Sequence, residues 1–74
     1  MKLTIRLSDL DDVKHFVDIT SRYEEGISLV NGDYEVDAKS ILGVYSMDLS
    51  ETVCLVCDLE DEALKRDLAP FIAA

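Results

Sequence analysis

The sequence predicts an α+β domain with the element order βαββαβα, in which one four-stranded antiparallel sheet is covered on a single face by three helices. Short apolar or alternating runs, typical of strands, are separated by segments with the three-to-four-residue apolar spacing of helices. An Asn-Gly pair between two extended runs is the strongest short-range signal for a hairpin, and hence for antiparallel pairing. The 74 residues suffice for one core, so we expect a single domain over 1–74.

The first strand and the first helix occupy the N-terminal third of the chain. Residues 2–7 alternate between apolar and polar side chains, which predicts a half-buried strand. Ser8 is expected to cap a helix over about 9–23, with Asp11 in the position of a capping-box acid. The apolar residues of this helix recur along one stripe, which we expect to pack on the sheet.

A hairpin is predicted after this helix. Residues 27–30 and 33–36 are extended runs on either side of Asn31-Gly32. A type I′ turn is expected there, because Asn and Gly both tolerate the positive φ that this turn requires. The apolar run 52–57 is the fourth strand, and its continuous apolar character favours a central place in the sheet.

Two more helices complete the predicted order. Ser40 opens a short helix as its N-cap, because a serine hydroxyl satisfies a free backbone amide. The last helix is expected over about 59–70, capped by Asp58 and followed by further acidic residues that suit the helix dipole. Pro70 lacks a backbone donor and disfavours helix at the residue before it, so we expect a kink or an end there.

The composition excludes several classes of function. Sixteen acidic against seven basic residues give a formal net charge of −9, so we expect binding neither to nucleic acid nor to anionic membranes. No run approaches the ~20 apolar residues that span a bilayer, and the cytoplasm is the expected compartment. So small a chain has no room for an enzyme cleft and a second domain. We expect neither enzymatic activity nor a cofactor.

Cys54 and Cys57 form a C-x-x-C pair, a spacing shared by zinc sites and redox sites. On a strand, residues three apart point to opposite faces, so one metal ion could not take both thiolates. A structural zinc site would need two further ligands, and the single histidine, His15, lies in a predicted helix. We therefore expect no metal site and interpret both cysteines as core residues in a reducing compartment.

The segment Asp37-Ala38-Lys39-Ser40-Ile41-Leu42 resembles the serine segment of the HPr-like phosphocarriers of the bacterial sugar phosphotransferase system. The resemblance implies the HPr-like open-faced β-sandwich and a regulatory phosphorylation site at Ser40. It also implies a protein-contact surface beside that serine, which consists of Lys39, Ile41, Leu42 and Met47. For some of the apolar members a core position is the alternative. Further points of likeness along the chain are Leu3-Thr4-Ile5, Phe16-Val17, Ile27-Ser28-Leu29, Asn31-Gly32 and Thr52-Val53.

The family's phosphate-accepting loop, a His-x-Arg-Pro after the first strand, is missing from this sequence. The corresponding segment, residues 7–12, carries three carboxylates and has neither an imidazole nor a cation, so it would repel phosphate. His15 lies two turns into the predicted helix, where no free backbone amides point at it. We interpret it as a surface histidine without a catalytic role.

Three functions remain open at this point. The first, which we prefer, is a non-carrier HPr-like regulator or adaptor that binds proteins of the phosphotransferase system or of carbon regulation. Ser40 is either its phosphorylation switch or only a helix cap. The second is a phosphocarrier that uses His15 or another nucleophile. The third is a small structural or oligomeric module whose edge strand, 33–36, pairs with another chain.

Overall fold

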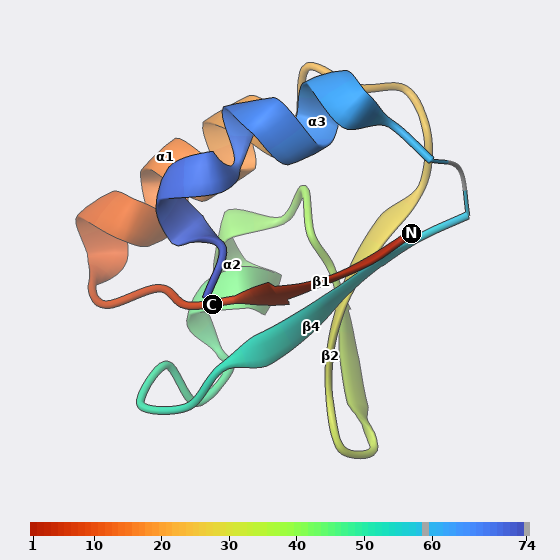
Figure 1. Cartoon of the computed structure of the whole chain (residues 1–74). Helices are drawn as coiled ribbons and strands as arrows, with labels where there is room; N and C mark the ends of the chain where they lie inside the picture. The colour runs from red at the N-terminus through yellow and green to blue at the C-terminus, as the bar shows by residue number, and fades with distance from the viewer. Residues whose placement is uncertain (59, 74) are drawn as a thin grey trace.

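The computed structural model describes residues 1–58 and 60–73, and within them four strands form one antiparallel sheet in the order β1-β4-β2-β3. The strands are β1 (Lys2–Ile5), β2 (Ile27–Asn31), β3 (Tyr34–Asp37) and β4 (Val53–Cys57). The helices are α1 (Leu10–Thr20), α2 (Ile41–Tyr45) and α3 (Glu62–Asp67), and a short 3-10 helix spans Ala69–Phe71. The helices lie on one side of the sheet (Figure 1), which confirms the predicted α+β architecture.

Strand β4 lies in the centre of the sheet, where its apolar sequence predicted it. It pairs with β1 on one side and with β2 on the other, both antiparallel. Val53, Leu55 and Cys57 are buried beneath the helices, whereas Cys54 and Val56 are partly exposed on the other face. The two cysteines therefore point to opposite faces of the strand, as predicted.

The β2–β3 hairpin closes with a different turn from the predicted one. Asn31 pairs with Tyr34, so the two central turn residues are Gly32 and Asp33. Gly32 has a φ of +62°, and no described residue other than glycine has a positive φ. Positive φ at the first central residue alone is the pattern of a type II′ turn, so the type I′ prediction is wrong. Asn31 stays in the ladder, which leaves the positive φ to glycine.

Helix α1 begins one residue later than predicted, because Asp9 and not Ser8 is its N-cap. The Asp9 carboxylate accepts a hydrogen bond from the Asp12 amide at 2.9 Å, and the Asp12 carboxylate accepts one from the Ser8 amide at 2.9 Å. A charged acceptor binds backbone amides more strongly than a hydroxyl and suits the positive end of the helix dipole. The helix ends at Thr20, short of the predicted 23.

Helix α3 is capped by Asp61 and not by Asp58 as predicted. The Asp61 carboxylate accepts a hydrogen bond from the Leu64 amide at 3.0 Å. With this start, Leu64 and Leu68, one turn apart, are both completely buried. The Asp61 carboxylate, which satisfies the Leu64 amide, therefore fixes the start of the helix.

The last helix also ends earlier than predicted. The regular helix stops at Asp67, and Pro70 lies in the 3-10 turn that follows. The expected break near this proline is confirmed, because its ring cannot continue an α-helix. The first residue of the predicted span 59–70, Leu59, lies outside the described residues.

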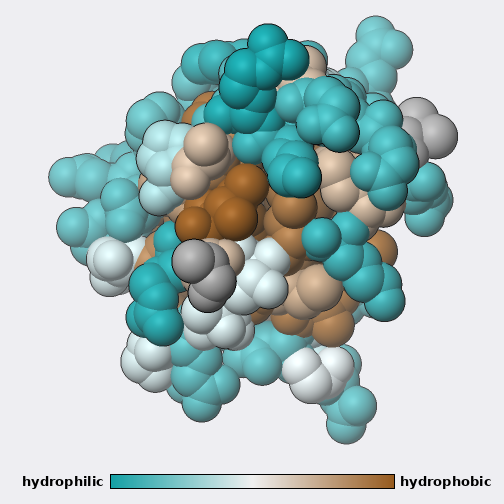
Figure 2. Space-filling model, viewed as in Figure 1, coloured by the Kyte–Doolittle hydropathy of each residue, from teal (hydrophilic) through white to brown (hydrophobic). Residues whose placement is uncertain are grey.

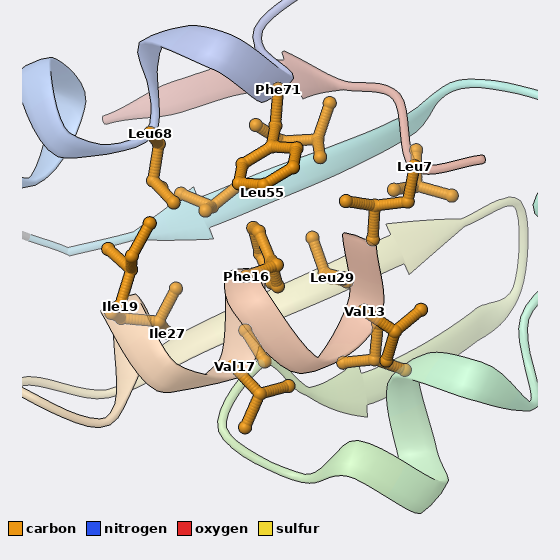
Figure 3. Close-up of a cluster of buried hydrophobic side chains, with 14 of the residues drawn as sticks. Leu7, Val13, Phe16, Val17, Ile19, Ile27, Leu29, Leu55, Leu68 and Phe71 are labelled. Carbon is orange, nitrogen blue, oxygen red and sulfur yellow. The ribbon is translucent and has the colours of Figure 1, made fainter. Parts of the chain in front are cut away.

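The hydrophobic core fills the space between the sheet and the helices (Figure 3). Phe16 of α1 meets Phe71 of the C-terminal 3-10 helix edge to face, with ring centroids 6.1 Å apart. This geometry is favourable for aromatic pairs and joins the first helix to the end of the chain. The completely or almost completely buried side chains include Ile5, Leu7, Val13, Phe16, Leu29, Val44, Leu55, Leu64 and Leu68.

The outer edge of β1 is covered by the residues that follow α3. The Arg6 amide donates to the Phe71 carbonyl at 2.8 Å, and the Ala73 amide donates to the Thr4 carbonyl at 2.9 Å. An isolated bridge joins Ile5 to Ile72 between these two bonds. Strand β3 forms the opposite edge, and the described part of the chain adds no strand outside it.

A buried hydroxyl fastens α1 to the loop before α2. Thr20 is completely buried, and its Oγ1 lies 2.8 Å from the Ala38 carbonyl oxygen and 3.1 Å from a carbonyl of its own helix. The Ala38 amide donates to the Ile27 carbonyl at 2.9 Å, and the Lys39 ammonium donates to the Tyr23 carbonyl. Together these bonds position the start of α2.

Replacement of Thr20 by valine tests this anchor. Thr20→Val keeps the shape of the side chain but leaves the buried Ala38 carbonyl without its donor, so we expect a loss of about 1–3 kcal/mol in the free energy of unfolding. Urea denaturation followed by circular dichroism measures the loss. Thr4→Val, at an exposed position, is the matched control and should change stability by less than about 0.5 kcal/mol. Equal stabilities of the two variants would contradict the anchor.

Tyr23 joins the end of α1 to α3. Its hydroxyl donates to the Asp67 carboxylate at 2.6 Å. This hydrogen bond, with the desolvation of the phenol and the negative charge of Asp67, raises the pKa of Tyr23 from 10.0 to about 12. The raised pKa means that the folded state favours the protonated phenol. The resulting stability is present below pH 10 and is lost as the pH rises towards about 12.

A spectrophotometric titration of tyrosinate checks this pairing. We expect one tyrosine to ionise near pH 12 in the folded protein. Tyr23→Phe should remove that transition, and Asp67→Asn should move it to lower pH because the acceptor and its charge are weakened. Tyr45→Phe is the control and should leave the high transition in place. Persistence of the transition in Tyr23→Phe would show that another group produces it.

Candidate functional site

A group of exposed hydrophobic side chains surrounds α2, and we name it the α2 patch: Tyr34, Ile41, Leu42 and Tyr45. Leu42 is 83% exposed, the highest value among the exposed large hydrophobic residues, and Tyr45 follows at 52%. Tyr34 is 49% exposed and Ile41 is 43% exposed. Three of the four residues belong to a helix of only five residues, so the exposure is concentrated on one small element.

The other side of α2 packs against the core, which turns the patch outward. Val44 is completely buried and Met47, three residues on, is 5% exposed. Gly43 lies close to β3: a Cβ atom there would meet the Cβ of Val36 and the side chain of Ser40 at 3.3 Å. Glycine at this position therefore allows the close approach of α2 to the sheet edge.

Tyr34 of β3 both belongs to the patch and holds the end of α2. Its hydroxyl oxygen lies 2.7 Å from the Ser46 Oγ, and the Ser46 hydroxyl donates to the Gly43 carbonyl at 2.6 Å. Because the serine proton is used in that bond, the tyrosine hydroxyl is the donor to Ser46. The C-terminal end of α2 is thus tied to the neighbouring strand.

Ser40 caps α2, as predicted. Its Oγ accepts a hydrogen bond from the Gly43 amide at 3.1 Å. The Asp37 carboxylate lies nearby and accepts from the Lys39 amide at 2.9 Å, while the Lys39 ammonium is bound to the carbonyl of Tyr23. The cation next to Ser40 in the sequence is therefore engaged at the C-terminal end of α1, where it suits the negative end of the helix dipole.

The predicted contact residues take three different places in the structure. Ile41 and Leu42 are exposed, as a contact role requires, and Lys39 is partly buried. Met47 is in the core, so its prediction as a surface contact is corrected. It follows α2 on the same side as Val44, one turn earlier, and this side faces the sheet. Tyr45 was not predicted as a contact residue, although its four-residue spacing from Ile41 places it on the same helix face.

A second surface feature is a concavity between β1, α1 and the C-terminal residues. Its ionisable side chains are those of Arg6, Asp12 and His15. Segment 7–12 lacks an imidazole and a cation, but the fold brings both beside it from the flanking residues. The His15 ring is exposed and meets Phe71 edge to face, with centroids 5.4 Å apart. The remaining lining residues are Thr4, Ser8, Thr52, Pro70, Phe71, Ile72 and Ala73.

Hydrophobic residues reach the surface on one side of the molecule. In the view of Figure 2, hydrophilic residues cover most of the periphery, and hydrophobic ones come to the surface between the helix layer and strands β1 and β4.

Within residues 1–58 and 60–73, no three His, Cys, Asp or Glu side chains are grouped so that they could hold a metal ion. No helix in the described part of the chain has both the length and the apolar character needed to cross a membrane.

Comparison with known proteins identifies the fold. No family model matches the sequence, and no curated protein matches it. Among solved structures, the chain is similar to the crystal structure of HPr-C-His from Thermoanaerobacter tengcongensis, with a TM-score of 0.75 and 22% sequence identity. The match covers 95% of this chain and 85% of that one. The chain therefore has an HPr-like fold, with four antiparallel strands and its helices on one face of the sheet.

Proposed function

We propose that this chain is a non-catalytic HPr-like binding module that uses the α2 patch to contact another protein. The observation that carries the proposal is the 83% exposure of Leu42, beside two exposed tyrosines, on a helix that is fixed at both ends. Tyrosines are enriched among the residues that dominate binding at protein interfaces. Complete burial of a leucine side chain contributes about 1.5–3 kcal/mol, so a partner that covers Leu42 would gain free energy from this contact.

The rigidity of α2 supports this role. A preformed contact surface loses less conformational entropy on binding than a mobile one, which leaves more of the contact energy as affinity. Ser40 and Gly43 hold the start of the helix, and Tyr34 and Ser46 hold its end. From the resemblance of the sequence to the HPr-like phosphocarriers, we take the partners to be proteins of the phosphotransferase system or of carbon regulation.

The start of α1 argues against phosphate carriage. The Asp9 carboxylate occupies the Asp12 amide in the first turn, so this position offers a negative charge where a phosphoryl group would need a positive one. The Ser8 amide is likewise taken by the carboxylate of Asp12. Arg6 and His15 lie in the same concavity, and they make a carrier role at His15 the alternative to be tested.

Ser40 is the proposed point of regulation. Its hydroxyl is part of the first turn of α2 and is adjacent in sequence to Ile41 of the patch. A phosphate there would add charge beside the apolar contact surface and beside the Asp37 carboxylate, and so would change affinity for a partner. A role for Ser40 as a cap alone is the competing explanation.

Substitution of Leu42 tests the contact surface. We expect a protein that is retained from cell extract by the immobilised wild-type chain to be lost with Leu42→Asp, because a charge in the centre of an apolar contact opposes its burial. Ala63→Asp adds the same charge at an exposed position of α3 and should retain that protein. Circular dichroism should show all three chains folded. Equal capture by all three would contradict the assignment of the patch.

Phosphorylation assays separate the binding module from a carrier. With phosphoenolpyruvate and the first enzyme of the phosphotransferase system, we expect no acid-labile phosphohistidine on this chain. With an ATP-dependent kinase of the HPr serine type, we expect labelling that Ser40→Ala abolishes. Labelling of His15 by phosphoenolpyruvate, lost in His15→Ala, would replace the binding module with the carrier. Absence of label from both residues would leave Ser40 as a helix cap.

A further inference from the structure

The face of the sheet opposite the helices carries charges of opposite sign at its two edges. None of the described helices covers this face (Figure 1), which we name the open face. The strand register arranges its side chains in rows that cross the sheet from β1 to β3. One row is Lys2, Val56, Ser28 and Asp37, and the next is Thr4, Cys54, Val30 and Glu35. The same register places Arg6 opposite the hairpin turn that contains Asp33.

The β1 edge of the open face is basic. Lys2 and Arg6 are both exposed, and neither forms an ion pair with another described residue. The chain has sixteen acidic and seven basic residues, so a basic edge is unusual in it. The side chains of β1 and of the next residue that lie on the open face are Lys2, Thr4 and Arg6, and none of them is acidic. The backbone amide of Arg6 is bound to Phe71, but its guanidinium is available for contact.

The β3 edge of the open face is acidic. Asp33, Glu35 and Asp37 are all exposed. The Asp37 carboxylate accepts a hydrogen bond from the Lys39 amide, which keeps it in place without neutralising its charge. Between the two edges lies a partly exposed apolar strip that consists of Val30, Cys54 and Val56.

We propose that the open face binds the open face of a second copy of this chain, as a two-fold symmetric dimer. A two-fold axis parallel to the strands, between β4 and β2, places β1 of each copy over β3 of the other and β4 over β2. Lys2 then faces Asp37 of the other copy, and Arg6 faces Asp33. The apolar strips meet in the middle, with the two sheets about 10 Å apart as in β-sandwiches. Each contact occurs twice, because the same surface is used by both copies.

Charge complementarity selects a second copy as the occupant. A basic partner would match only the β3 edge, and an acidic partner would match only the β1 edge. A surface with a basic edge, an apolar strip and an acidic edge is complementary to its own two-fold image. The net charge of −9 opposes approach at long range, but at physiological salt the screening length is about 8 Å, so the facing pairs dominate at contact.

The size of the face predicts a weak, reversible dimer. Four strands about 4.8 Å apart and up to five residues long form a face roughly 15–20 Å on each side. The area of such a face, roughly 200–400 Å², is smaller than the ~800 Å² that each partner of a standard interface buries. We therefore expect a dissociation constant in the micromolar range or weaker. The α2 patch lies on the helix side and stays free in this dimer, so the proposal does not depend on the proposed function.

Analytical ultracentrifugation over micromolar to millimolar concentrations tests the dimer with two charge-reversed variants. The basic-edge variant, Lys2→Glu with Arg6→Glu, has a net charge of −13, and the acidic-edge variant, Asp33→Lys with Asp37→Lys, has −5, because each reversal shifts the charge by two from −9. We expect the dissociation constant of each variant alone to rise roughly tenfold or more, because like charges then face each other in both copies of every contact. A mixture of the two variants should dimerise again, since opposite charges then face each other throughout.

The control variant, Lys14→Glu with Lys65→Glu, also has a net charge of −13 but changes only exposed residues of the helix layer. It should dimerise as the wild type does. The acidic-edge variant is less repulsive overall, so its weaker dimerisation would show a specific effect of the facing charges. A wild-type chain that stays monomeric at all concentrations would overturn the proposal. So would a basic-edge variant that dimerises normally, or a mixture of the two reversed variants that stays monomeric.

Discussion

The buried hydroxyl of Thr20 is the constraint on which the placement of α2 depends. Isolated helices shorter than about 12–15 residues are marginal in water, so a five-residue helix keeps its shape only through its tertiary contacts. Thr20 binds the carbonyl of Ala38, and the loop that starts there leads directly into the Ser40 cap. Val44 and Met47 then seat the helix on the core. The apolar surface is therefore presented by the whole fold and not by the helix alone.

Much of the fold was predictable, because hydrophobic spacing and turn residues are local signals. The order of the elements, the central place of β4 and the Ser40 cap all agree with the sequence analysis. The ends of elements were harder to predict where neighbouring acceptors compete. Ser8 and Asp9 both qualify as caps by residue type, and only the folded backbone decides between them. In the hairpin, Asn31 was predicted in the turn, but its pairing with Tyr34 keeps it in the strand.

The candidate site was only partly predictable, because its members come from separate elements. Ile41 and Leu42 follow Ser40 directly, so the sequence resemblance led to them. Tyr34 reaches the site from β3 through its bond to Ser46, a contact that no local pattern indicates. Met47 was misplaced because a methionine after a short helix fits a surface patch and a core equally well by residue type. The grouping of Arg6 with His15 also depends on tertiary structure.

The C-terminal residues cover the edge of β1 and so prevent another chain from pairing with that strand. Residues 71–73 occupy the hydrogen-bonding edge of β1, whereas β3 has a free edge that is protected by its carboxylates. Proteolytic removal of these residues would expose a strand edge flanked by Lys2 and Arg6, complementary in charge to the β3 edge of another molecule. Such edge-to-edge pairing is head to tail, so it leads to filaments wherever the rotation between successive copies does not close a ring. The short C-terminal segment therefore also acts as a barrier against polymerisation.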